Sequence, residues 1–345
     1  MKHTKGDLKQ MQSLPLAAKI RMTERRIMDW YDYWNGDVYV SFSGGKDSTV
    51  LLDICRKLYP DIEALFVDTG LEYPEIRQFV KTFENVTIVR PEMRFDEVIK
   101  KYGYPIISKE VSQRIHEYRV NPNGWAKARW DNEGKYAIKG GSRYDISRWK
   151  PLRDSDIPAS HYCCNVMKKA PAKAYEKATG KKPILATMAS ESALRATEWY
   201  KSGCNAYDGK RAVSKPLSFW TEQDVLQYIK QKGLPIASVY GQIVYSSSPE
   251  QMRIEEFITD CEADKLRTTG CSRTGCIFCG FGCHLDKSPS RFESLKETHP
   301  RQYDYCIGGG EYDERGKWQP NKKGLGLGHV FDELNNIYGN DFIKY

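Results

Sequence analysis

The amino-acid sequence predicts an α/β protein with a doubly wound parallel sheet and a smaller, cysteine-rich C-terminal region. A β-branched and aromatic run at 37–42 stops at two glycines and is followed by a helix-like run at 49–54. Further short apolar runs then alternate with stretches of helical spacing as far as residue 188. After residue 270 the cysteines become closely spaced. These observations favour one large α/β domain and a different C-terminal part.

The first predicted element is an amphipathic helix over residues 14–34. Apolar side chains such as Ile20, Ile27, Tyr31 and Trp34 recur there at mostly three- and four-residue spacing. We expect this helix to pack on the domain and to lead into the first strand.

The turn after that strand has the composition of a phosphate cradle. Two glycines let backbone N–H groups approach an oxyanion, and the following helix adds the positive end of its dipole. The spacing differs from that of a Walker A loop, which has four residues between its first glycine and Gly-Lys-Ser/Thr. We expect Lys46, Asp47 and Ser48 to take part in catalysis, with Asp47 holding Mg²⁺ directly or through water. The predicted binding residues of this segment are Ser41, Ser43, Gly44, Gly45, Lys46, Asp47 and Ser48.

Later strands should bring further polar residues to the same edge of the sheet. A strand at 62–67 ends at Asp68, Thr69 and Gly70; a helical stretch at 73–83 and a strand at 86–89 follow. Another strand at 183–188 leads into Glu191 and Arg195. Because ligands bind at the carboxyl ends of parallel strands, we expect these five residues to lie near the phosphate cradle.

Composition and charge set broader limits. Lysines and arginines exceed acidic residues by eight among 345 residues, a weak indication of a phosphorylated or nucleic-acid partner. The polar start of the chain and the lack of a long uncharged run predict a soluble, cytoplasmic protein with no membrane partner. In a reducing compartment, clustered cysteines suggest metal binding, and isolated ones suggest core packing.

The segment Ser43-Gly44-Gly45-Lys46-Asp47-Ser48 resembles the PP-loop of the adenine nucleotide α-hydrolase superfamily. With three other stretches, it makes the chain similar to the phosphoadenosine phosphosulfate (PAPS) reductase family over roughly residues 36–285. Those stretches are Val67–Gly70 with Tyr73–Glu75, Ser190–Ser192 with Arg195, and Lys215–Leu217 with Trp220–Glu222. The resemblance implies an N-terminal helical segment at 1–35, a nucleotide-binding α/β domain at 36–245 and a cysteine-rich region at 246–345.

The resemblance also gives the cysteines a role. The tandem Cys163-Cys164 looks like the motif of adenylylsulfate reductases, in which a later Cys-x-x-Cys completes a [4Fe-4S] site; here that pair is Cys276 and Cys279. Zinc is the second choice of metal. A local set of Cys271, Cys276, Cys279 and Cys283 is a rival arrangement, and reduced thiols packed in a core are the third. Cys55, Cys204, Cys261 and Cys306 are expected to be packing residues.

Three functions stay open. The intact loop favours an enzyme that cleaves ATP between its α and β phosphates and adenylates a substrate for iron–sulfur-assisted sulfur transfer. The alternative is a reductase that forms sulfite from adenylylsulfate or PAPS with electrons from a thiol donor. This reading needs another nucleophile, with Cys283 and Cys306 as candidates, because residues 338–345 lack the cysteine that the reductases carry near their end. A nucleotide-binding regulatory protein without turnover is the third.

The partners follow from these functions. We expect an adenine nucleotide and a protein that donates sulfur or electrons. Between Arg114 and Arg153 cationic side chains interleave with aromatic rings, a composition that suits a splayed or single-stranded nucleic acid. An insertion whose rings pack on the core is slightly favoured over that interpretation.

Overall fold

The computed structural model describes residues 3–134, 145–208, 211–246 and 265–345. The chain forms two compact units, each made of separate stretches of sequence. The first consists of Met1–Asp68, Glu72–Arg90 and Pro171–Thr274, and the second of Thr69–Leu71, Pro91–Ala170 and Gly275–Tyr345.

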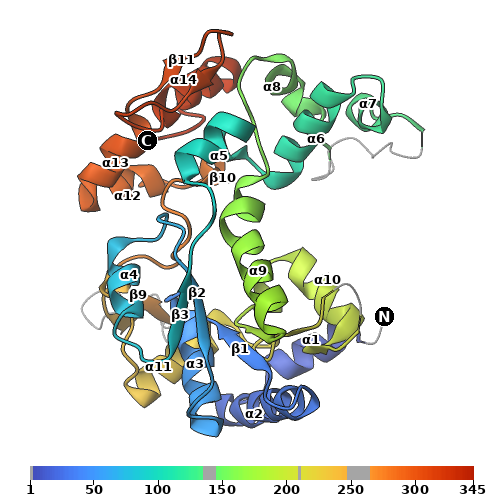
Figure 1. Ribbon diagram of the computed structural model, residues 1–345, viewed down its shortest axis with the longest axis vertical. Helices are drawn as coiled ribbons and strands as arrows, with labels where there is room; N and C mark the ends of the chain where they lie inside the picture. The colour runs from blue at the N-terminus through green and yellow to red at the C-terminus, as the bar shows by residue number, and fades with distance from the viewer. Residues whose placement is uncertain (1–2, 135–144, 209–210, 247–264) are drawn as a thin grey trace, which may run out of the picture. The chain divides into compact units, whose positions relative to one another are not determined.

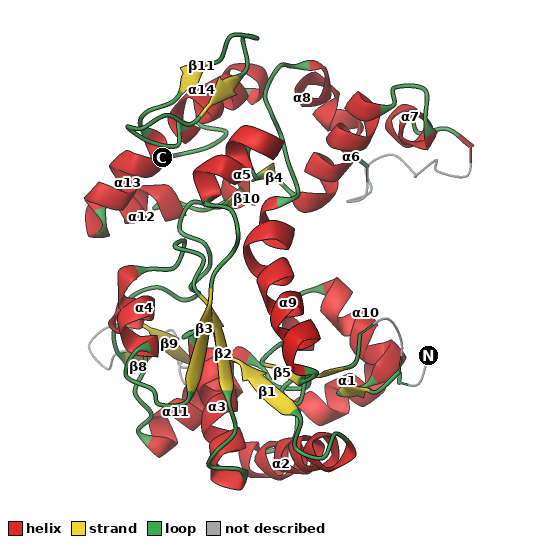
Figure 2. Ribbon diagram, viewed as in Figure 1, coloured by secondary structure: helices red, strands yellow, loops and turns green. Residues whose placement is uncertain are grey.

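A six-stranded sheet in the order β3-β2-β1-β5-β7-β6 forms the centre of the first unit (Figures 1 and 2). All neighbours run parallel except β6, which is antiparallel to β7. In the central register Val40 lies between Ala64 and Ile184, and all three side chains are buried. The strands are β1 (Val38–Ser41), β2 (Ala64–Val67), β3 (Val86–Val89), β5 (Lys182–Leu185), β6 (Asn205–Ala206) and β7 (Val213–Ser214).

Helices and a small antiparallel strand pair complete this unit. Figure 1 shows α3 beside α2, and α3 packs against both α2 and α11. The helices are α1 (Lys5–Gln12), α2 (Leu16–Tyr33), α3 (Lys46–Leu58), α4 (Pro74–Val80), α9 (Ala170–Thr179), α10 (Ala193–Ser202) and α11 (Glu222–Lys232). The pair consists of β8 (Ile243–Tyr245) and β9 (Leu266–Thr268).

Helix α2 confirms the predicted amphipathic helix. Its buried residues are Leu16, Lys19, Thr23, Ile27 and Trp30, which recur at the three- and four-residue spacing of one helix face. The buried Lys19 forms an ion pair with Asp224 at 2.7 Å, which compensates the positive charge on the buried face of the helix.

The second unit is mainly helical. Its helices are α5 (Phe95–Tyr102), α6 (Lys109–Val120), α7 (Trp125–Asp131), α8 (Lys150–Asp154), α12 (Arg291–Thr298), α13 (Pro300–Ile307) and α14 (Leu327–Tyr338). Its short strands are β4 (Ile106–Ile107), β10 (Gly280–Phe281), β11 (Glu311–Tyr312) and β12 (Trp318–Gln319). The parallel pairing of β10 with β4 joins two distant parts of the sequence.

Pro300 separates two helices of the C-terminal part, since α12 stops at Thr298 and α13 begins with Pro300. The turns at Gly308–Gly310 and Gly324–Gly328 touch, because a Cβ on Gly309 would lie 2.3 Å from the backbone nitrogen of Gly324.

The two units do not follow the contiguous divisions 1–35, 36–245 and 246–345 that the sequence suggests. Residues 1–35 belong to the same unit as the sheet, and residues 91–170 belong to the unit that contains the C-terminus. Within the described residues, no helix is both long enough and apolar enough to cross a membrane.

Candidate functional site

The phosphate cradle forms at the carboxyl end of β1, where Ser43–Gly45 connect the strand to α3. The backbone amide of Ser43 donates a hydrogen bond to Ser48 Oγ at 3.2 Å, and the two hydroxyl oxygens lie 3.0 Å apart. Gly44 has φ +71°, and a Cβ there would lie 2.7 Å from a methyl carbon of Val80. Only glycine fits this turn without displacing its neighbours.

Lys46 is buried at the first turn of α3, with an exposed fraction of 3%. Its Nζ donates to the carbonyl oxygen of Ser272 at 2.7 Å and lies 3.1 Å from a carboxylate oxygen of Glu222. Its backbone N–H donates to the hydroxyl of Tyr240, which also bonds Thr274 Oγ1 at 2.6 Å. A segment far along the chain therefore lies directly over the loop.

Two buried oxygens in this region lack hydrogen-bond partners within the described residues. They are Asp47 Oδ1 and Thr187 Oγ1. The nearest cation to Asp47 Oδ1 is Lys46 Nζ, at the long ion-pair distance of 3.9 Å. Burial raises the pKa of the Asp47 carboxyl group above its usual value. Unsatisfied buried acceptors of this kind are costly, and a bound ligand or cation would satisfy them.

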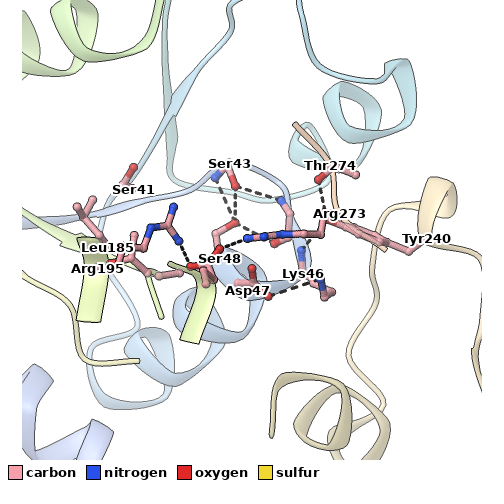
Figure 3. Close-up of a pocket in the computed structure, with 14 residues that line it drawn as sticks. Ser41, Ser43, Lys46, Asp47, Ser48, Leu185, Arg195, Tyr240, Arg273 and Thr274 are labelled. Atoms are coloured by element: carbon pink, nitrogen blue, oxygen red, sulfur yellow. Dashed lines mark hydrogen bonds and ion pairs between the residues drawn. The ribbon is translucent and has the colours of Figure 1, made fainter. Parts of the chain in front are cut away.

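These groups line one cavity of about 290 Å³ in the first unit (Figure 3). Three cationic side chains, Lys46, Arg195 and Arg273, face it, and Glu191 forms ion pairs with both arginines. The lining residues are Ser41, Ser43, Gly45, Lys46, Asp47, Ser48, Leu185, Ala186, Thr187, Glu191, Arg195, Tyr240, Arg273 and Thr274. A polar cavity with three cations at a helix N-terminus suits a polyanion such as the phosphate chain of a nucleotide.

Most of the binding residues expected from the sequence meet in this cavity. Gly44 shapes the loop without lining the cavity. Asp68 does not line it either, and pairs with Arg77 at 2.9 Å and Arg90 at 3.3 Å. Thr69 and Gly70 belong to the second unit.

Sequence reasoning missed several lining residues. Leu185, Ala186 and Thr187 stand at the end of β5, so the rule that ligands bind at the carboxyl ends of strands could have identified them. Nothing in the sequence marked Tyr240, Arg273 or Thr274, because only tertiary folding brings them to the loop.

A second pocket, within the second unit, collects four cysteines. Cys163 and Cys164 line it together with Cys276 and Cys279. Its remaining wall is mostly apolar, with Leu71, Phe95, Pro105, Met167 and Lys168. The four thiols expected to form one site therefore share one pocket, although the tandem pair and the Cys-x-x-Cys pair are far apart in the sequence.

The two sulfur atoms of the tandem pair lie close together. Cys163 Sγ donates to Cys164 Sγ at 3.9 Å, which lowers the pKa of Cys164 and raises that of Cys163. Lys109 and Lys168 also favour the thiolate of Cys164. The thiolate is the form in which a cysteine binds a metal.

The rival local set is not gathered in this pocket. Cys271 belongs to the first unit, and Cys283 is buried with its Sγ donating to the carbonyl oxygen of Gly280 at 3.0 Å. Burial raises the pKa of Cys283 to about 12 and raises that of Cys306 as well. Neither thiol suits the role of an accessible nucleophile.

The cysteines expected to be packing residues are buried wherever the structure describes them. Cys55, Cys204 and Cys306 are buried, whereas Cys261 lies outside the described residues. Across the described part of the chain, no three His, Cys, Asp or Glu side chains group closely enough to hold one metal ion.

In the stretch between Arg114 and Arg153, many cationic and aromatic side chains contact one another or the backbone of the same stretch. Trp130 and Trp149 are buried, and the guanidinium of Arg153 lies over the rings of Tyr118 and Trp130. Arg119 donates to four backbone carbonyls between Leu152 and Ile157. These contacts match the insertion that packs on a core, while Lys135, Tyr136, Lys139, Arg143 and Tyr144 lie outside the described residues.

Some known proteins resemble this chain over about two thirds of its length, and others over a much shorter stretch. Adenosine 5′-phosphosulfate reductase of Staphylococcus epidermidis is 24% identical, over 63% of this chain and 70% of that protein. Sulfate adenylyltransferase subunit 2 of Rhizobium tropici is also 24% identical, over 67% of this chain and 69% of that protein. An uncharacterized protein of Methanocaldococcus jannaschii is 36% identical, but over 21% of this chain and 18% of its own length.

A crystal structure of phosphoadenylyl-sulfate reductase from Candida auris is similar at 14% identity and a TM-score of 0.36, over 69% of this chain and 91% of that chain. The family model of the phosphoadenosine phosphosulfate reductase domain matches residues 37–280, which include the loop, the residues that line the cavity beside it and all four pocket cysteines. The chain therefore belongs to the phosphoadenosine phosphosulfate reductase domain family.

Proposed function

We propose that this protein reduces an adenylylated sulfate, adenosine 5′-phosphosulfate or its 3′-phosphorylated form, to sulfite. The observation that carries this proposal is the convergence of Cys163, Cys164, Cys276 and Cys279 on one pocket. The same cysteine pattern resembles that of adenylylsulfate reductases. A relative named adenosine 5′-phosphosulfate reductase matches 63% of the chain.

The cavity at the PP-loop supplies the binding part of the proposal. A phosphosulfate group carries negative charge on both its phosphorus and its sulfur ends. Lys46, Arg195 and Arg273 would offset this charge, and the N-terminus of α3 would add backbone donors. Charge that develops on the departing AMP would be stabilised by the same groups.

The four cysteines fit a [4Fe-4S] cluster, with zinc as the second choice. Thiolates are the ligands that such clusters require, and the apolar wall of the pocket would shield the cluster from water. Such a cluster would supply electron transfer near its ligands.

The reaction needs a dithiol donor, which we propose to be a partner protein. One thiolate of the donor attacks the sulfate sulfur, so an S–S bond forms and the S–O bond to the nucleotide breaks, with its electron pair leaving on AMP or, for PAPS, on adenosine 3′,5′-bisphosphate. The second thiolate then attacks the donor sulfur, which releases sulfite and leaves the donor as a disulfide. The donor thus loses two electrons and the sulfate sulfur gains them.

ATP cleavage between the α and β phosphates, for sulfur transfer to an acceptor such as a nucleic acid, is the second candidate. It is favoured by the complete Ser43–Ser48 loop and by the unsatisfied Asp47 Oδ1, an oxygen ligand of the type that Mg²⁺ prefers. Asp47 would hold the metal, and Lys46 would stabilise charge on the departing pyrophosphate.

One experiment separates the two candidates. Anaerobically purified protein is given adenylylsulfate, PAPS or ATP with Mg²⁺ and a dithiol, and both sulfite and pyrophosphate are measured. The proposal expects sulfite from an adenylylated sulfate, with the rate about a hundredfold lower in Lys46→Ala. Lys177→Ala, which changes an exposed lysine on α9, should keep full activity.

Pyrophosphate release from ATP without sulfite formation would overturn the reductase and establish the second candidate. Nucleotide binding with neither product would indicate a binding protein without turnover.

A further inference from the structure

A third cavity, of about 390 Å³, lies within the second unit and belongs to neither of the sites above. It forms where the segment after α8 meets the β11–β12 hairpin and one face of α14. Every residue that lines it lies within the described residues, and none of them is a cysteine or part of the PP-loop.

Three aromatic rings form part of its wall. The ring centroids of Tyr312 and Trp318 are 5.0 Å apart at 70°, and those of Tyr312 and His329 are 5.6 Å apart at 84°. A hydrogen bond of 3.0 Å between the Tyr312 hydroxyl and His329 Nε2 fixes this corner, while Trp318 Nε1 donates to the carbonyl oxygen of Gly326 at 2.9 Å. The Trp318 and His329 rings lie 4.1 Å apart at 39° and cover part of each other, whereas Tyr312 is 59% exposed and presents most of the free aromatic surface.

Acidic side chains complete the wall. Asp154, Asp156 and Glu333 line the cavity, and Asp154 is already paired with Arg153 at 2.7 Å. Among the described residues, neither Asp156 nor Glu333 forms an ion pair. Arg119 is near enough to Asp156 for electrostatic attraction, while its N–H groups donate to backbone carbonyls. The cavity therefore keeps negative charge on a protein whose formal net charge is +8.

The carboxylates and the aromatic rings together indicate which class of ligand fits the cavity. A compact metal ion would need three or more ligands around one point, and the described residues nowhere provide such a group. An alkylammonium group has a diffuse charge that is attracted both to π faces and to carboxylates. Its methylene chain can also cover the apolar wall contributed by Ile157, Val330 and Ile337.

We propose that this cavity binds an organic cation with alkylammonium groups, either a free polyamine or the lysine side chain of a peptide. The guest would place its ammonium group between the Tyr312–Trp318 corner and the carboxylates of Asp156 and Glu333.

Isothermal titration calorimetry on the full chain tests this proposal with spermidine and with a lysine-containing peptide as probes. Saturable binding of either probe is expected, with affinity reduced at least about fivefold in Glu333→Gln and in Tyr312→Leu. Glu297→Gln, which neutralises an exposed carboxylate of α12 outside the cavity, should bind as the unchanged protein does. The preference between the two probes identifies the source of the ammonium group.

Two results would overturn the proposal. One is the absence of saturable binding of both probes, and the other is binding that Mg²⁺ at equal ionic strength abolishes or that Glu297→Gln weakens equally. Thermal unfolding of each variant checks that it folds, and Asp156→Asn replaces Glu333→Gln if the latter does not.

Discussion

The side chains in the first turn of α3 determine which polar groups the cavity offers to an anion. Lys46 is buried, its neighbour Asp47 is partly buried with Oδ1 enclosed, and both side chains line the same cavity. Such pairs are costly to the folded protein unless a ligand uses them. We therefore expect Lys46 and Asp47 to lower the stability of the ligand-free protein and to contribute to ligand binding.

Asp47→Asn should raise stability at neutral pH. Because burial raises the pKa of the Asp47 carboxyl, the folded protein holds that proton more tightly than the unfolded chain does. The associated stability is full below the ordinary pKa of 3.8 and is lost as the pH rises through the higher folded value. Urea unfolding at pH 8 should show a gain for Asp47→Asn, and the gain should shrink at pH 4, close to the ordinary pKa of 3.8. A gain that is equal at both pH values would contradict this account.

Glu191→Gln should tighten the binding of anions at the PP-loop. Glu191 pairs with Arg195 and Arg273, so its charge competes with a phosphate or sulfate group for the same guanidinium groups. Loss of this competition is expected to strengthen nucleotide binding by about 1 kcal/mol, or roughly fivefold, in calorimetry. Glu198→Gln is the matched control, because Glu198 pairs with Lys215 and does not line the cavity. Equal affinities in both variants would mean that Glu191 does not compete.

The β1-loop-α3 element works because its turn is both left-handed and crowded. Gly44 has φ +71°, and its missing side chain leaves space that methyl groups of Ile76 and Val80 occupy. The backbone conformation and the close packing therefore both require glycine at position 44. Neither condition alone would make the turn so intolerant of substitution.

Gly44→Ala should destabilise the protein by about 2–4 kcal/mol and abolish nucleotide binding. Gly180→Ala provides the control, since Gly180 has φ +75° but no atom within 4 Å of the added Cβ. The control should cost only about 1 kcal/mol in chemical denaturation, because it introduces backbone strain without a clash. Similar losses in the two variants would show that crowding by α4 has no effect.

At the scale of the whole molecule, two cysteine pairs that are distant in sequence meet in one pocket. The tandem pair precedes a π-helical turn at Asn165–Lys169, and Cys276–Cys279 leads into β10, which pairs with β4. The metal site that we propose thus depends on the fold of the whole second unit and not on a local motif.

Cys164→Ser should lose most of the iron and the visible absorption of anaerobically reconstituted protein. Cys271→Ser should retain both, because Cys271 lies in the first unit and outside the pocket. Iron analysis and absorption spectroscopy provide the measurement. Loss of iron in Cys271→Ser with retention in Cys164→Ser would instead support the local set of cysteines.

Much of the fold followed from local pattern. The predicted strand at 86–89 coincides with β3, and the predicted helix at 14–34 corresponds to α2. The loop and the residues after β5 meet at one cavity because parallel strands place their carboxyl ends at the same edge. Hydrophobic periodicity and glycine chemistry act over a few residues, so the sequence alone determined these elements, the family and most of the loop site.

Tertiary structure decided the rest. Contacts between distant segments place Tyr240, Arg273 and Thr274 over the loop, and they form the aromatic cavity beside α14. They also make each of the two units from separate stretches of sequence. Asp68 stands at the predicted strand end, yet it pairs with Arg77 and Arg90 outside the lining of the cavity. Such contacts are selected by the packing of the complete chain, because many partners are compatible with each local sequence and only the folded core chooses among them.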